Sequence, residues 1–208
     1  MKPIDLSTPL SFGASFRFPL QSPLARKEVL WGALLLVVLP GWGWLLNMGH
    51  RIAYVRNMQQ GRPPFPAWTD YRQLTWDGLV TFVGMVWYHA PASVLLVLGG
   101  WFDSAPLLAL GGLLWCAATA VVPGYMTHYC KHGDARAIFN PLLAIRRLRA
   151  GGWAYGHAWA IALAALVLSF LGLAGFGVFF FVSSVWFWQV AGFSFATVFS
   201  QEFELVDE

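Results

Sequence analysis

Residues 78–98 read GLVTFVGMVWYHAPASVLLVL, and this stretch decides the class of fold. Only Tyr88, His89 and Pro91 interrupt its apolar character. A helix needs about 20 apolar residues to cross the roughly 30 Å hydrocarbon layer of a membrane. We therefore expect residues 78–98 to form a transmembrane helix.

Two more apolar runs follow. Residues 106–127 contain no charged side chain, and no Asp, Glu, Lys or Arg lies between Arg149 and Glu202. The second run is long enough for two crossings, which we place at residues 158–172 and 177–199. The glycines near its middle suit the turn of a helical hairpin; they are Gly172, Gly175 and Gly177.

The composition supports the same class of fold. The 208 residues are 58% hydrophobic and only 11% charged, whereas soluble domains carry about a quarter charged residues. Lipid offers the backbone no hydrogen-bond partners, and the chain lacks the alternation of a barrel, so its spans must be helices. We expect an all-α polytopic membrane helix bundle with a single transmembrane domain at 29–200. A cytoplasmic or interfacial segment at 1–28 precedes it, and an acidic tail at 201–208 follows.

Residues 29–48 are apolar and long enough to span, but they contain helix breakers at their centre. Pro40, Gly41 and Gly43 fall in the sequence LPGWGW. Proline removes a helix hydrogen bond and glycine adds backbone freedom, so we expect a break there. The segment is then either a kinked crossing or a re-entrant hairpin that returns to the side it entered.

The distribution of charge favours the re-entrant alternative. Cytoplasmic loops collect Lys and Arg, and basic residues gather in residues 1–28, 49–73 and 129–153, whereas the link at 100–105 carries only Asp103. With a re-entrant hairpin, all thirteen basic residues lie on one side. We therefore expect four full crossings in the cell membrane, with the basic loops and the C-terminus in the cytoplasm.

The elbow GRPPFPAWTDYRQLTWDGL at residues 61–79 is expected to lie at the membrane surface. Its prolines stiffen the chain, and Trp68, Tyr71 and Trp76 are rings suited to the headgroup layer. Thr69 or Asp70 can cap the next helix. Arg72 and Asp77 are expected at the water boundary.

A second surface segment, HGDARAIFNPLLAIRRLRAGG, covers residues 132–152. Asp134 is expected to cap a helix, and Asn140 and Pro141 mark a break and a restart. Basic amphipathic helices lie in the membrane interface and attract anionic lipids. The candidate contacts to lipid headgroups are Arg136, Arg146, Arg147 and Arg149.

Few polar residues inside the spans are candidates for function. His89 and Gln189 are polar groups at membrane depth, where ionisable side chains are costly and often functional. Pro91 is expected to break the helix beside His89. A neutral His89 that only hydrogen-bonds within the bundle is the simpler alternative. His128 and His132 share a helical face, but they are only weak candidates for metal ligands. We therefore expect no metal ion, and we also expect no cofactor.

The order of these segments resembles a known family. The chain contains FRFPLQSPLARKEVLWG, GHRIAYVRNMQQGRPPFPAW, the helix start TWDGL, HGDARAIFNPLLAIRR and a glycine-bent final hairpin. Together they resemble a family of small prokaryotic multi-pass membrane proteins known only as a domain of unknown function. The resemblance covers roughly residues 14–200 and implies the architecture but no activity. Gly49-His50 departs from it, because the family pattern has an aromatic residue after the glycine.

The sequence offers little for catalysis. It contains no phosphate-binding glycine loop, no paired carboxylates in the membrane and no nucleophile–base set at convincing spacing, so we do not expect an enzyme or a nucleic-acid-binding protein. A stripe of small residues at Gly112, Cys116 and Ala120 allows close helix packing. We expect a non-catalytic scaffold or assembly protein that binds lipid or partner helices, either as a homo-oligomer or with another membrane protein. The alternative is a small permease or oligomeric pore with a path near His89 and Pro40.

Overall fold

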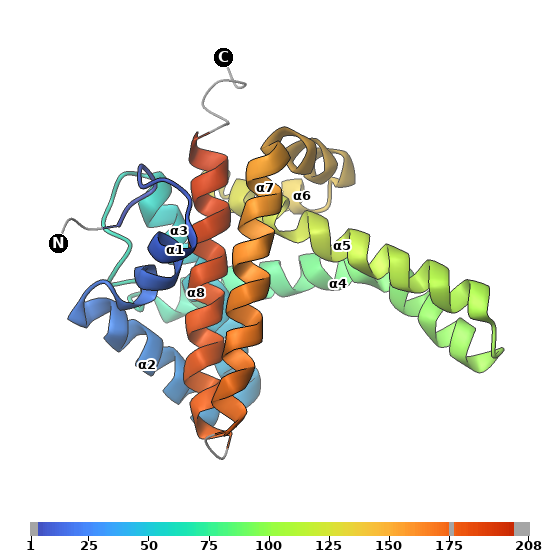
Figure 1. Cartoon of the computed structure of the whole chain (residues 1–208), viewed down its shortest axis with the longest axis horizontal. Coiled ribbons are helices and arrows are strands. Elements are labelled where there is room, and N and C mark those ends of the chain that lie inside the picture. Colours follow the sequence, from blue (N-terminus) through green and yellow to red (C-terminus); the bar gives the residue numbers. More distant parts are fainter. Residues whose placement is uncertain (1–3, 175–176, 202–208) are drawn as a thin grey trace.

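The computed structural model describes residues 4–174 and 177–201, which form helices and loops with no strand among them (Figure 1). The predicted tail at 201–208 lies outside this range beyond Gln201. The elements, in chain order, are α1 (Phe12–Arg17), η1 (Phe18–Leu20), α2 (Pro23–Val38), α3 (Pro40–Gln59), α4 (Tyr71–Trp101), α5 (Ala105–His132), α6 (Ala135–Ile138), α7 (Pro141–Phe170), η2 (Leu171–Ala174) and α8 (Val178–Gln201).

Four helices are long and apolar enough to cross a membrane, which confirms the predicted fold class. They are α4, α5, α7 continued by η2, and α8. Helices α4 and α7 begin well before the predicted spans, at Tyr71 and Pro141, because polar turns such as residues 71–77 continue the helix beyond its apolar part. The chain is therefore an all-α, multi-pass membrane protein.

The core of the protein surrounds α8, which packs on α7 and also contacts α1, η1, α2, α3 and α5 (Figure 1). Phe18 of η1 is fully buried and stacks on Phe193 of α8, with 4.6 Å between the ring centroids. Tyr54 and Phe65 complete this aromatic centre. The short N-terminal elements are thus part of the bundle.

The predicted break near Pro40 is present. Helix α2 ends before Leu39, and Pro40 is the first residue of α3. The chain then folds back on itself: the Asn47 side chain donates to the Gly32 carbonyl at 3.0 Å, and Gly43 has no Cβ where the Leu35 carbonyl approaches. Residues 23–59 therefore form a helical hairpin, and neither of its helices is among the four candidate spans.

The predicted helix break at Pro91 is wrong. Helix α4 runs through Pro91 for 31 residues without interruption. Proline has a helical φ of about −65° and removes only one backbone donor. In an apolar helix, nearby hydroxyls can satisfy freed carbonyls, and the Ser93 hydroxyl donates to the His89 carbonyl at 2.9 Å.

The predicted interfacial segment at 132–152 is divided from the span that follows it. Asp134 accepts a hydrogen bond from the Arg136 amide, and Asn140 caps α7, as expected. Helix α7 then kinks at Gly152, where φ is 49°, a conformation that favours glycine. Residues 141–151 consequently form a separate helical part that runs in a different direction from the span (Figure 1).

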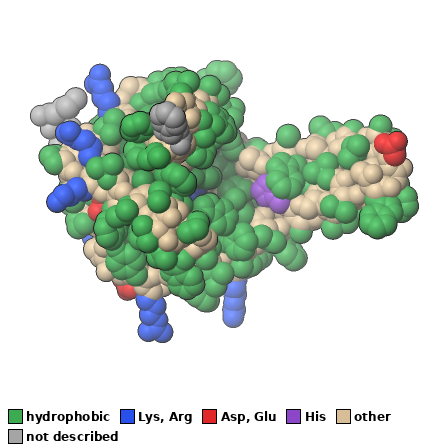
Figure 2. All heavy atoms as spheres, turned by 90° about the horizontal axis from the view of Figure 1, so that it is seen from below, with side chains coloured by type: hydrophobic (Ala, Val, Ile, Leu, Met, Phe, Trp, Pro, Cys, Tyr) green, Lys and Arg blue, Asp and Glu red, His purple; other side chains and the backbone are tan. Residues whose placement is uncertain are grey.

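Helices α4 and α5 form an arm that projects from the rest of the molecule (Figures 1 and 2). The two helices pack closely at Gly99 and Gly111, where a Cβ atom would lie 2.9 Å from Leu108 and from Leu96. The arm surface is largely hydrophobic, and the Lys and Arg side chains gather on the body (Figure 2). The hairpin of α7 and α8 runs in a clearly different direction from the arm (Figure 1).

Candidate functional site

Helix α3 carries three polar side chains into the body, and each meets a different partner. The first is His50, which is 2% exposed and lies 2.7 Å from the Glu28 carboxylate of α2. Burial lowers the pKa of His50, although Glu28 opposes this effect. A neutral His50 donates from Nε2 to Glu28, which also accepts from the Ala67 amide at 3.1 Å. This pair ties the α2–α3 hairpin to the loop before α4.

Trp68 packs against this pair of residues. Its ring stacks on His50 with 4.1 Å between centroids, and its Nε1 donates to the Glu28 carbonyl at 3.1 Å. Trp68 is half-buried, and its role as an interfacial anchor remains a prediction. Tyr71 and Trp76 are exposed, as such anchors require.

The second group is Arg56, which forms a bidentate ion pair with Asp77 of α4 at 3.0 and 3.1 Å. Asp77 is fully buried and also accepts from the Tyr129 hydroxyl at 2.7 Å. The expectation that Asp77 remains at the water boundary is thus wrong. Because buried charges require partners, these contacts join α3, α4 and α5 at the base of the arm.

The third group is Arg51, and it differs from the other two. Its guanidinium lies over the Trp188 ring, 4.7 Å from the centroid, and one nitrogen is 3.0 Å from the Met126 sulfur. Burial lowers the pKa of Arg51, but the group remains charged. Among the described residues, no carboxylate lies within ion-pair distance of it.

Arg51 and Trp188 border two cavities. One, of about 330 Å³, is lined by parts of α2, α3 and α8, including Pro40, Asn47 and Ser184. The other, of about 400 Å³, lies between the base of the arm and the α7–α8 hairpin. Its lining is almost entirely apolar, and neither cavity is lined by Asp or Glu.

His89 lines the cavity of about 400 Å³, whereas Gln189 lines neither of these two cavities. Nδ1 of His89 is 2.8 Å from the Met85 carbonyl and Nε2 is 3.1 Å from the Thr119 hydroxyl. The histidine therefore joins α4 to α5, which is the simpler alternative from the sequence. Gln189 is 1% exposed, and its side-chain amide has no hydrogen-bond partner among the described residues.

The other predicted site residues are not brought together. Arg136, Arg146 and Arg149 are exposed as a lipid-facing segment requires, but Arg147 is buried against α5 near Gly124, so its predicted headgroup role is wrong. The rings of His128 and His132 are 4.3 Å apart. Among the described residues, no group of three His, Cys, Asp or Glu side chains is placed to hold a metal ion.

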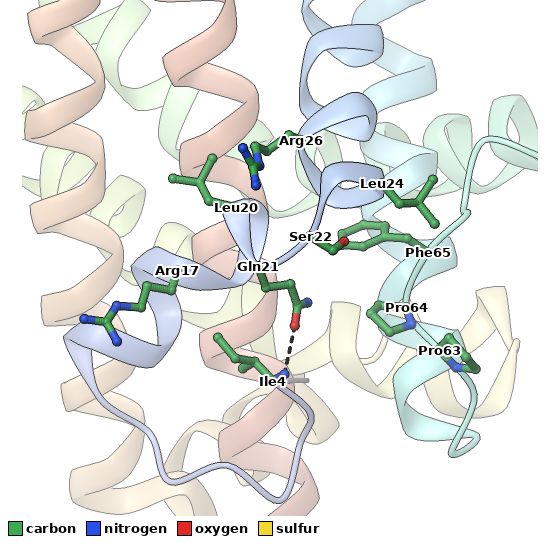
Figure 3. A pocket seen from close by; sticks show the side chains of 10 residues that line it. All are labelled: Ile4, Arg17, Leu20, Gln21, Ser22, Leu24, Arg26, Pro63, Pro64 and Phe65. Carbon is green, nitrogen blue, oxygen red and sulfur yellow. Dashed lines mark hydrogen bonds between the residues drawn. The ribbon is translucent and has the colours of Figure 1, made fainter. Parts of the chain in front are cut away.

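A third cavity, of about 510 Å³, opens at the surface beside η1 (Figure 3). Arg17 lies on one side of it, and Pro63 and Pro64 of the loop before α4 lie on the other. Between them, the Gln21 side chain accepts a hydrogen bond from the Ile4 amide at 2.8 Å. This contact fastens the N-terminal segment across the cavity.

The comparisons with known proteins do not identify the site. No family model, no curated protein and no solved structure matches the chain. The resemblance to a family of small multi-pass membrane proteins consequently remains a prediction.

The polar groups of α3 and Glu28 were not identified from the sequence. Arg51 and Arg56 were treated only as positive charge in a loop, and Glu28 belonged to the polar N-terminal segment. Their spacing did carry a signal: His50, Tyr54 and Asn57 recur at helical intervals beside these arginines, which predicts a helix with one polar face toward the body.

Proposed function

We propose that this protein is a non-catalytic membrane scaffold or assembly protein whose α4–α5 arm packs against partner helices in the bilayer. We place it in the cell membrane of a prokaryote, with its basic loops and C-terminus in the cytoplasm. The positive-inside rule supports this orientation. The observation that carries the proposal is the arm itself.

The outer half of the arm exposes large apolar side chains. Trp101 is 82% exposed, Leu113 69% and Phe102 68%, and no charged side chain lies between Asp77 and Asp103. Lipid can cover such a surface, but membrane helices also associate through close packing at small residues. A projecting hairpin offers partner helices more than one face.

The small-residue stripe of α5 supports partner packing. A Cβ added at Gly112 would have no neighbour within 4 Å, and Cys116 is exposed. The arm uses Gly99 and Gly111 for its own packing. Gly112 and Cys116 are therefore left for a helix from another chain, which is either a second copy or a different membrane protein.

The basic segment at 141–151 supports a scaffold that also holds lipid. Arg146 and Arg149 are exposed beside the exposed apolar residues Leu142 and Ile145. Such helices lie in the interface plane and attract anionic headgroups. The kink at Gly152 allows this segment to lie flat while the rest of α7 crosses the bilayer.

Native mass spectrometry of the protein extracted with its own lipids tests the proposal. We expect the wild type to carry a second chain, and Gly112→Leu to lose it because the leucine fills the open stripe. Gly156→Leu is the matched control, since Gly156 of α7 also faces open space. If Gly112→Leu assembles like the wild type, the arm is not the docking face.

A small permease or oligomeric pore is a second candidate, and one observation favours it. Pro40 lines one cavity, His89 lines the other, and both cavities share Arg51. Broken helices often form the binding sites of transporters. A complex of three or more copies, together with flux that His89→Ala abolishes without changing assembly, would support this candidate over the scaffold.

A further inference from the structure

Arg51 is a half-buried cation, and among the described residues no carboxylate lies within ion-pair distance of it. Its described partners are the face of Trp188 and the sulfur of Met126, at 4.7 Å and 3.0 Å. A sulfur is a weak acceptor, and a charge away from water normally has a charged or strongly polar partner. By contrast, Arg56 on the same helix has a bidentate carboxylate.

The space beside Arg51 has the shape of a site for an amphiphile. The larger cavity, of about 400 Å³, lies between helices of the two spanning hairpins and is lined by apolar side chains such as Leu166, Phe187 and Phe195. Small-molecule sites typically have volumes of about 300–1,000 Å³. The smaller cavity adds polar groups on the other side of Arg51, from Asn47 and Ser184.

We propose that Arg51 binds the phosphate of an anionic phospholipid, whose acyl chain occupies the larger cavity between the α4–α5 arm and the α7–α8 hairpin. Arginine binds phosphate through two parallel hydrogen bonds, and basic pockets between membrane helices bind anionic headgroups. The headgroup extends toward Asn47 and Ser184. This site is separate from the exposed arginines of residues 141–151 and does not depend on partner packing at the arm.

Trp188 positions Arg51 within this site. Its ring fixes the guanidinium at the border between the two cavities. The lipid phosphate then approaches the edge of the guanidinium, because the ring covers its face. Among the described residues, no Asp or Glu lines either cavity, so none of them competes with the lipid phosphate for Arg51.

Native mass spectrometry in mixed micelles of phosphatidylglycerol and phosphatidylcholine with the same acyl chains tests the proposal. We expect the wild type to retain phosphatidylglycerol preferentially and Arg51→Gln to lose roughly tenfold in that preference. Arg51→Lys, which keeps the charge, retains part of it. Arg62→Gln is the control at an exposed arginine outside both lipid-binding regions, and it retains the wild-type preference. Equal retention of the two lipids by the wild type, or an unchanged preference in Arg51→Gln, would overturn the proposal.

A second experiment uses only the wild-type protein, so it does not depend on whether a variant folds. Phosphatidylglycerol with a photoreactive group in its acyl chain is cross-linked to the wild type, and the labelled peptides are mapped. We expect labels at cavity residues such as Trp159, Leu166 and Phe187. Labels confined to outward-facing residues such as Leu113 and Val167 would overturn the proposed lipid site. Displacement of the lipid by a peptide or a free fatty acid at equal concentration would overturn it as well.

Discussion

The guanidinium of Arg51 lies over the indole of Trp188, 4.7 Å from its centroid, and thereby connects α3 to the central helix α8. Tyr54, one turn further along α3, donates its hydroxyl to the Trp188 carbonyl at 3.2 Å. The same two helices thus meet through a cation–π contact and a hydrogen bond. This junction holds the α2–α3 hairpin against the core.

We expect Trp188→Leu to lower the free energy of unfolding by about 0.5–2 kcal/mol, the usual strength of a cation–π contact. The loss is measured by unfolding in detergent with increasing denaturant. Trp153→Leu is the control, because Trp153 is 91% exposed. Equal stability of the two variants would show that the Arg51 contact contributes nothing.

Asp77→Asn should cost more. Removing one partner of a fully buried ion pair typically costs roughly 3–5 kcal/mol, and we expect a loss at or below the lower end of this range because Arg56 is 20% exposed. Here the amide keeps one acceptor oxygen but carries no charge, so Arg56 loses its bidentate ion pair and shares the remaining oxygen with the Tyr129 hydroxyl. We expect the double variant Arg56→Met with Asp77→Asn to be more stable than Asp77→Asn alone. A double variant that loses the full sum of both single effects would contradict this coupling.

The stability of the protein should fall in acid partly through His50. Burial places the pKa of folded His50 below its ordinary value of 6.5, so the unfolded chain binds a proton that the folded chain resists. Stability is therefore present above pH 6.5 and is lost as the pH falls below it. We expect His50→Phe, which keeps the stacking on Trp68, to lose less stability than the wild type as the pH falls below 6.5. Unfolding in denaturant at several pH values measures this loss. An identical pH slope in the two proteins would exclude His50 as a cause.

The crossing of α3 and α4 depends on two glycines. A Cβ at Gly49 would collide with the Leu74 carbonyl, and one at Gly78 would collide with the Leu45 carbonyl. Overpacking of this kind costs about 1–3 kcal/mol. We expect Gly49→Ala and Gly78→Ala to unfold at lower denaturant, whereas Gly41→Ala, where the space is open, should not. Harmless substitutions at both crossing positions would rule out this close approach.

The spans and the breaks could be predicted from the sequence, because they depend on local length and composition. Twenty apolar residues and a proline beside two glycines act within one segment, so the helices and the break at Leu39 follow from them. Caps at Asp70, Asp134 and Asn140 are local in the same way. The error at Pro91 arose because a long apolar helix tolerates one missing donor.

The buried polar groups could not be predicted, because their partners are distant in the sequence. Glu28 and His50 are 22 residues apart and meet only after the α2–α3 hairpin has formed. Tyr129 reaches Asp77 across 52 residues. Charge alone predicts Asp77 at the water boundary and Arg147 at the lipid headgroups, whereas tertiary packing buries both. The orientation of the arm also depends on contacts that no single segment specifies.

In the proposed function, the Gly112–Cys116 face of the arm packs against another chain in the membrane. Cross-linking of Cys116 with a bismaleimide in native membranes tests it most directly, in a Cys130→Ser background that leaves one described cysteine. We expect a cross-linked product that contains a second chain, and no such product when the cysteine is moved to residue 156 by Gly156→Cys with Cys116→Ser. If Cys116 reacts with a soluble maleimide or a lipid probe but the protein remains a single chain with the bismaleimide, this face does not pack against another chain.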